Sequence, residues 1–174
     1  NTLGQVFGSE LNVNPHAIMC VAGREQSLLE PVTRTSLACN APQTYTASGL
    51  LQMNRATIRD YVARRIISLA PGSEFSKKST SVKLLKTILG KDLSKKLMAP
   101  KPVGTFGKCD YKSTCREIAD KLWDQLGNSV QLQILLASVT IKEKNYNLEN
   151  YYGSESIEEN KIYKDNIMRC VRCM

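Results

Sequence analysis

One glutamate of this chain, Glu25, has the chemical type and the spacing expected of a catalytic acid. The apolar residues Ile18 and Val21 recur at helical spacing, and Glu25 falls on the same stripe, seven residues after Ile18. A charged carboxylate on a face that should be buried must find a partner or keep its proton. A carboxyl group that is protonated near neutral pH can act as a general acid. The structural alternative is a buried Glu25 paired with Arg24 or Arg34.

A second polar signal is the stretch Ser48-Gly49-Leu50-Leu51-Gln52-Met53. Its serine and glycine stand where a backbone can approach a ligand closely, and its glutamine lies among apolar residues. The amide of Gln52 costs free energy unless it is hydrogen-bonded, and a sugar hydroxyl or N-acetyl group could satisfy it. The alternative is a tight turn that leads into the next helix. Alone, neither this stretch nor the glutamate identifies a function.

Other kinds of catalytic chemistry find little support in the sequence. His16 is the only histidine, and its place in the first turn of a predicted helix indicates a structural role. A single histidine argues against Ser-His and Cys-His pairs and against the usual zinc-hydrolase motifs. From Gln26 to Arg59 the only further acid is Glu30, which points about 140° away from Glu25 on a helix. A catalytic Glu25 would therefore have to act alone, first as acid and then as base.

The composition is that of a globular protein, and its positive charge is concentrated in one segment. The 174 residues suffice for one domain, and the net charge is +8. Such a basic segment either binds an anionic polymer, such as a cell wall, a membrane surface or nucleic acid, or is a solvated helix face. Aromatic residues do not interleave with the lysines, which argues against base stacking. The lysines of this segment are Lys77, Lys78, Lys83, Lys86, Lys91, Lys95, Lys96 and Lys101.

The six cysteines favour disulfides and an oxidising compartment. They allow fifteen pairings, among which the sequence does not choose. Neighbours along the chain would give the pairs 20–39, 109–115 and 170–173. The rival interpretation is a zinc site made by Cys109, Cys115, Cys170 and Cys173, whose spacing fits the usual patterns poorly. We expect no metal. The disulfide candidates are Cys20, Cys39, Cys109, Cys115, Cys170 and Cys173.

The periodicity predicts a mostly helical single domain with a small irregular or β-hairpin lobe around residues 31–48. Asn14 and Pro15 are a good helix start. The second helix should expose Arg55, Arg59 and Arg65. No apolar run is long enough to span a membrane, and residues 1–4 show no signal peptide, so if the protein is exported we expect this to be the mature or a trimmed form. The predicted helices cover about residues 15–29, 54–69, 82–89, 93–97, 114–126, 132–139 and 162–171.

Taken in order, several of these motifs resemble the soluble lytic transglycosylase and goose-type lysozyme superfamily. The resemblance rests on Asn14-Pro15, Ile18, the Arg-Glu-Gln-Ser around Glu25, and Ser48 to Met53 followed by Ala56-Thr57. A looser match covers residues 150–167, with Asn150-Tyr151-Tyr152-Gly153 and Ile162-Tyr163, and the lysine-rich middle is not covered. The chain departs from the family pattern in having Leu51 for Met, Tyr152 for Asn, and Gln26 between the acid and Ser27.

The resemblance implies a lysozyme-like fold over residues 1–174 and cleavage of the β-1,4 bond between N-acetylmuramic acid and N-acetylglucosamine in peptidoglycan. Glu25 would protonate the glycosidic oxygen, without a cofactor. We expect the protein to be a monomer, exported to the periplasm or the cell exterior, with glycan strands rather than nucleic acid as its partner. By carry-over, the residues that would line or face the glycan groove are Ser48, Gly49, Leu50, Gln52, Met53, Tyr151 and Tyr163.

The resemblance leaves the product and the exact substrate open. A 1,6-anhydro product would make the protein a lytic transglycosylase, and attack by water would make it a lysozyme. The cysteine and lysine content is also similar to that of lysozymes of this family that predatory bacteria direct at deacetylated peptidoglycan. Two other functions compete with the enzyme: a non-catalytic cationic cell-wall-binding module of the same fold, and a cationic protein of nucleic acid or membrane surfaces.

Overall fold

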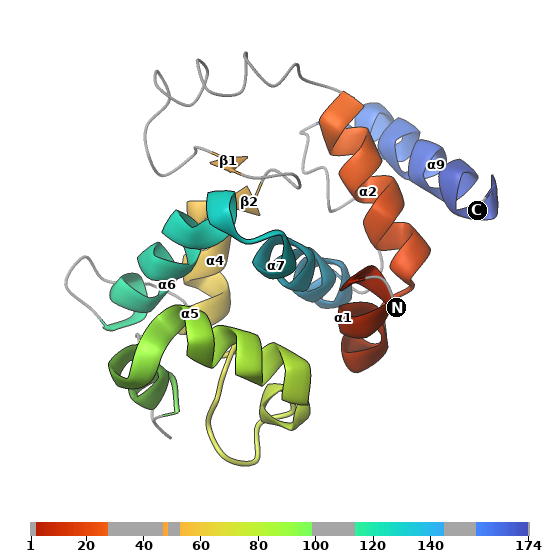
Figure 1. The fold of residues 1–174 in the computed structure, drawn as a ribbon. Coiled ribbons are helices and arrows are strands. Elements are labelled where there is room, and N and C mark those ends of the chain that lie inside the picture. Colours follow the sequence, from red (N-terminus) through yellow and green to blue (C-terminus); the bar gives the residue numbers. More distant parts are fainter. Residues whose placement is uncertain (1–2, 28–46, 49–52, 99–113, 145–155, 174) are drawn as a thin grey trace.

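The protein is mostly helical, as the sequence predicts, over the residues that the structure describes (Figure 1). This structure is a computed structural model, and it describes residues 3–27, 47–48, 53–98, 114–144 and 156–173. The helices are α1 (Leu3–Leu11), α2 (Pro15–Ser27), α4 (Arg55–Ala63), α5 (Ser79–Leu97), α6 (Thr114–Gln125), α7 (Val130–Glu143) and α9 (Ile157–Cys173). Two 3-10 turns, η1 (Phe75–Lys77) and η2 (Leu126–Asn128), and two short strands, β1 (Ala47–Ser48) and β2 (Met53–Asn54), complete the described elements.

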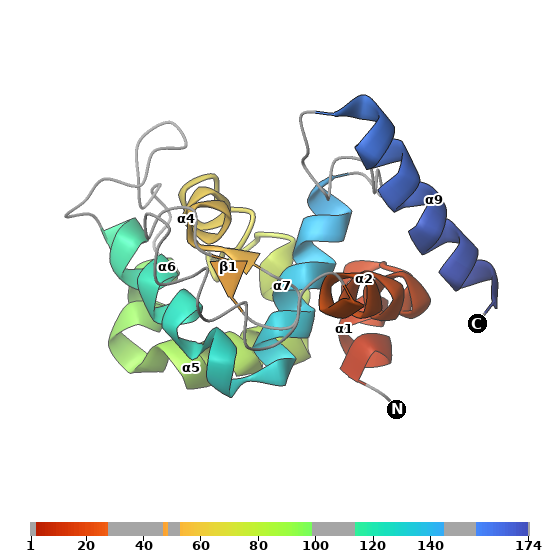
Figure 2. The same ribbon diagram turned by 90° about the horizontal axis from the view of Figure 1, so that it is seen from above.

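Helix α7 is the centre of the fold. Figures 1 and 2 show it between α4, α5 and α6 on one side and α1 and α2 on the other. Leu132, Leu135 and Leu136 are fully buried in it. The apolar run that predicted a core helix is therefore confirmed, because a helix surrounded by other helices must be apolar on most of its faces.

The first two helices meet at a tight turn. Helix α1 was not predicted from the sequence, and its Phe7 and Leu11 are buried. Gly8 permits the turn, because a Cβ atom there would lie 2.6 Å from the carbonyl oxygen of Val13. The predicted start of α2 is confirmed: Asn14 Oδ1 accepts a hydrogen bond from the His16 backbone N–H at 2.9 Å.

Helix α4 ends at Ala63, six residues earlier than predicted. Ile66 N–H donates to Tyr61 O and Arg65 N–H donates to Val62 O, and Arg65 has φ 61°. This is the Schellman ending, in which one residue adopts the left-handed conformation. Glycine usually fills that position, so no stop signal precedes Pro71-Gly72 in the sequence.

Helix α5 was predicted as two pieces separated at Gly90. Gly90 has φ 75° and ψ −179° inside α5, a conformation essentially restricted to glycine. At the other end of α5, Glu10 of α1 accepts hydrogen bonds from the backbone N–H groups of Thr80 (2.7 Å) and Ser81 (2.9 Å). A carboxylate from a distant helix therefore caps α5, which joins α1 to α5.

A disulfide between Cys20 and Cys170 joins α2 to α9. Of the pairings that the sequence left open, the neighbour pairs 20–39 and 170–173 are therefore excluded, because α9 packs on α2 and brings together cysteines that are 150 residues apart. Cys173 is free and exposed. Cys115 is also disulfide-bonded, and Cys109 and Cys39 lie outside the described residues. A disulfide sulfur is no longer a thiolate, so the four-cysteine zinc site does not form.

The small lobe predicted around residues 31–48 lies mostly outside the described residues. Its end is described: β1 pairs with β2 in an antiparallel hairpin, with Ala47 opposite Asn54 and Ser48 opposite Met53. None of the described helices is long and apolar enough to cross a membrane.

Candidate functional site

The predicted acid, Glu25, lies on α2 (Pro15–Ser27), and the residues that follow Ser27 are outside the described part of the chain. The residues that precede it on the same stripe, Ile18 and Val21, are fully buried, so this stripe does face the core. The structure describes the backbone of Glu25 but not its side chain, and its role as an acid remains a prediction.

The β1–β2 hairpin carries the second motif. Ser48 ends β1 and Met53 begins β2, while Gly49, Leu50 and Gln52 lie outside the described residues. Figure 1 shows the hairpin beside the start of α4, on the same side of α7 as the C-terminal end of α2. The side chain of Met53 is 4% exposed and belongs to the hydrophobic core. Met53 therefore anchors β2 to the hydrophobic core. For Met53 to contact a sugar, the residues that cover its side chain would have to move.

The two predicted tyrosines lie in the C-terminal part of the chain. Tyr163 is on α9 and is 2% exposed, so solvent hardly reaches it in this structure. Tyr151 lies outside the described residues. Their contacts with a glycan remain predictions.

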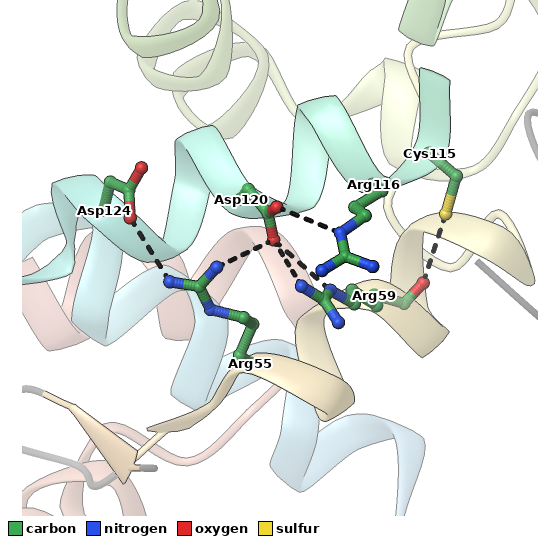
Figure 3. Close-up of polar contacts among 6 residues, drawn as sticks. All are labelled: Arg55, Arg59, Cys115, Arg116, Asp120 and Asp124. Atoms are coloured by element: carbon green, nitrogen blue, oxygen red, sulfur yellow. Dashed lines mark hydrogen bonds and ion pairs between the residues drawn. The ribbon is translucent and has the colours of Figure 1, made fainter. Parts of the chain in front are cut away.

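A cluster of charged residues fixes α4 against α6 (Figure 3). Asp120 of α6 lies at its centre: Oδ1 accepts hydrogen bonds from Arg59 Nη2 at 2.9 Å and Nε at 3.3 Å. Arg55 Nη1 is 3.3 Å from the same oxygen, and Arg116 Nε is 3.5 Å from Oδ2. Arg55 also reaches Asp124 at 3.6 Å. Three arginines therefore share one carboxylate.

The prediction that Arg55 and Arg59 are exposed on the outer face of their helix is wrong. Their side chains are only 14% and 12% exposed, because Asp120 attracts them into the α4–α6 interface. A signal was present in the sequence. Arg55 and Arg59 are four residues apart, and so are Asp120 and Asp124, which gives two helix faces of complementary charge.

An aromatic ring and a disulfide-bonded cysteine also contact the cluster. The guanidinium of Arg55 stacks over the ring of Trp123, 4.2 Å from its centroid. Cys115 Sγ lies 3.5 Å from the carbonyl oxygen of Arg59, a contact rather than a hydrogen bond because a disulfide sulfur has no proton to donate. Arg55 directly follows β2, so the cluster fixes the point where the hairpin joins α4.

A shallow, open cavity of about 590 Å³ lies between α4 and the end of α7. Arg64 bridges two of its acids, Asp60 and Glu143, and burial lowers the pKa of Lys144. Burial also raises the pKa of Tyr61. The cavity is lined by Ala56, Thr57, Asp60, Tyr61, Arg64, Glu143 and Lys144.

Metal binding and similarity to known proteins were each tested. Within the described parts of the chain, no three His, Cys, Asp or Glu residues are grouped so that they could bind a metal ion. The chain matches no protein-family model, no curated protein and no solved structure significantly.

Proposed function

We propose that this protein cleaves the β-1,4 glycosidic bond of peptidoglycan between N-acetylmuramic acid and N-acetylglucosamine, with Glu25 as its only acid and base. One observation carries the proposal: Glu25 lies on α2, and the paired strands β1 and β2, which flank Gly-Leu-Leu-Gln in the sequence, lead directly into α4. This helix–hairpin–helix order is the one that the resemblance to the transglycosylase and goose-type lysozyme superfamily implies. The remaining groove residues are those carried over from that resemblance.

In the proposed reaction, Glu25 protonates the oxygen of the leaving sugar and then accepts a proton as base. The described carboxylates Asp120 and Asp60 are poor candidates for a second catalytic carboxylate, because three arginines occupy the oxygens of Asp120 and Arg64 pairs with Asp60. The substrate's own acetamido oxygen would then stabilise the sugar cation. Either its 6-hydroxyl closes a 1,6-anhydro ring or water attacks, and the product distinguishes a lytic transglycosylase from a lysozyme.

The surroundings of the proposed site fit an exported enzyme. A disulfide such as Cys20–Cys170 forms and persists in oxidising compartments, which supports a periplasmic or extracellular location. The proposed reaction needs no cofactor. The proposed partner is the glycan strand, bound by a monomer.

The decisive experiment compares two isosteric variants on purified cell wall. Glu25→Gln removes the acid, and we expect the rate of turbidity loss to fall by about 10²–10⁴-fold, the usual contribution of a general acid. The matched control is Glu30→Gln, which makes the same charge change five residues later and should keep the wild-type rate. Equal activity of Glu25→Gln and wild type would refute the assignment. If neither protein clears the wall but both pellet with it, the protein is a binding module.

A second measurement identifies the product and the substrate. Mass spectrometry of the released muropeptides separates anhydro ends from reducing ends. Parallel digests of acetylated and deacetylated walls show which glycan the protein prefers.

A further inference from the structure

Helix α5 carries lysines on both sides of its break at Gly90 that have no acidic partner among the described residues. Lys83, Lys86, Lys91 and Lys95 are exposed, and no ion pair involves them within the described part of the chain. We name these four residues the α5 lysine face. The fifth lysine of α5, Lys96, differs because it is paired with Glu117 at 2.8 Å.

Much of the positive charge elsewhere in the described chain has acids close by. The arginines of α4 and α6 converge on Asp120. On α9, four basic residues are accompanied by three acids, Glu158, Glu159 and Asp165. On α5 the only acid is Asp92, against five lysines. The uncompensated charge of the described chain is therefore strongest along this helix.

The spacing of the lysines has a cost that an anionic ligand would remove. Lys83 and Lys86 are three residues apart before the break at Gly90, and Lys91 and Lys95 are four apart after it, so each pair shares a face of its own half of α5. Like charges at these spacings repel and weaken a helix. A flexible chain of negative charges that follows both halves would replace this repulsion by attraction.

The rest of the α5 surface limits what such a ligand can be. Its N-terminal N–H groups already bind the carboxylate of Glu10, so an anion has to lie along the flank rather than at that end. Helix α5 contains no aromatic residue for base stacking. No large hydrophobic side chain is exposed on α5, which leaves nothing to insert into a bilayer. The exposed large hydrophobic residues of the described chain are Met19, Val130, Ile157, Ile162 and Met168.

From these observations we infer that the α5 lysine face binds an extended phosphodiester polymer without bases or acyl chains, such as the polyol-phosphate polymers of cell walls. The choice of a wall polymer rests on the proposed function. In Figure 1, α5 lies at the opposite end of the molecule from the β1–β2 hairpin and the C-terminal end of α2. A polymer bound to α5 therefore leaves the proposed glycan site open and holds the enzyme at its insoluble substrate.

The test uses two triple variants of the full chain that change the net charge equally. Lys83→Gln/Lys86→Gln/Lys91→Gln alters the α5 lysine face, and Lys161→Gln/Arg169→Gln/Arg172→Gln alters exposed residues of α9. The probe is soluble, fluorescently labelled poly(glycerol phosphate), and its anisotropy is measured over a series of salt concentrations. We expect the α5 variant to lose affinity about tenfold or more, with the slope of log K against log salt smaller by about 2 to 3. The α9 variant should bind almost like wild type.

Three results would overturn the inference. The first is a wild-type protein that leaves the anisotropy of the polymer unchanged. The second is an equal loss of affinity in both variants, which would mean that only net charge counts. Tighter binding to single-stranded DNA of the same charge, or to anionic lipid vesicles, would assign the surface to another partner. The proposed function is tested apart from this. On walls stripped of phosphate polymer, the α5 variant should clear turbidity at the wild-type rate, while Glu25→Gln should still bind the polymer.

Discussion

Replacing Asp120 by asparagine should destabilise the fold by about 2 kcal/mol. The carboxylate accepts two hydrogen bonds from Arg59 and forms ion pairs with Arg55 and Arg116. Removing one partner of a buried ion pair costs about 3–5 kcal/mol, because it leaves a charge uncompensated. The side chain of Asp120 is 28% exposed, so water screens part of this loss and reduces it to about 2 kcal/mol. The amide of asparagine would also turn an N–H donor toward guanidinium groups that can only donate.

The chain supplies a matched control on the same helix face. Asp124→Asn makes the same charge change one turn later, but Asp124 is 59% exposed and has one contact, at 3.6 Å to Arg55. We expect this variant to lose about 0.5 kcal/mol or less. Urea unfolding followed by far-UV circular dichroism measures both, and Asp120→Asn should also lower Tm by about 4–8 °C. A loss for Asp120→Asn no larger than for Asp124→Asn would refute the view that this cluster holds α4 on α6.

Three further predictions concern the described helices. Burial would raise the pKa of Glu10, but hydrogen bonds at the start of α5 outweigh this and lower the pKa to about 2. The ionised Glu10 therefore adds about 1 kcal/mol to the free energy of unfolding, after allowing for solvent screening. This stabilisation is present above pH 5 and is lost as pH falls toward 2. Unfolding of Glu10→Gln and wild type should accordingly differ at pH 7 and converge near pH 2, and a constant difference would contradict this. Gly8→Ala should lower the free energy of urea unfolding by about 1–3 kcal/mol, because the added methyl group meets a carbonyl oxygen. Gly4→Ala is the control: the nearest contacts there are at 3.8 Å, so this change should be neutral or slightly stabilising. Serine at both Cys20 and Cys170 should lower stability by about 2–5 kcal/mol, since the bond closes a loop of 150 residues, and an unchanged Tm would mean that the bond is not formed.

Local features of the sequence were sufficient to predict much of the helical pattern. Asn14 with Pro15 started α2, the apolar run around Leu135 marked the core helix α7, and Gly90 marked the break in α5. Each of these signals acts within one turn or along one helix face, so it can be read without knowing any neighbour. Where a local signal was missing, as at the Schellman ending with Arg65, the helix boundary was predicted wrongly.

The tertiary structure decided which distant residues meet. Arg55 looked like a solvent-exposed residue of an amphipathic helix until α6 brought Asp120 against it. Cys20 bonds to Cys170 rather than to a cysteine nearby in the chain, and Glu10 caps a helix that begins 69 residues after it. Charge, sulfur and hydrogen-bonding capacity were all visible in the sequence. Their partners were not, because an ion pair, a disulfide or a cap contributed by another helix depends on how the helices pack, and helix packing is a property of the whole chain.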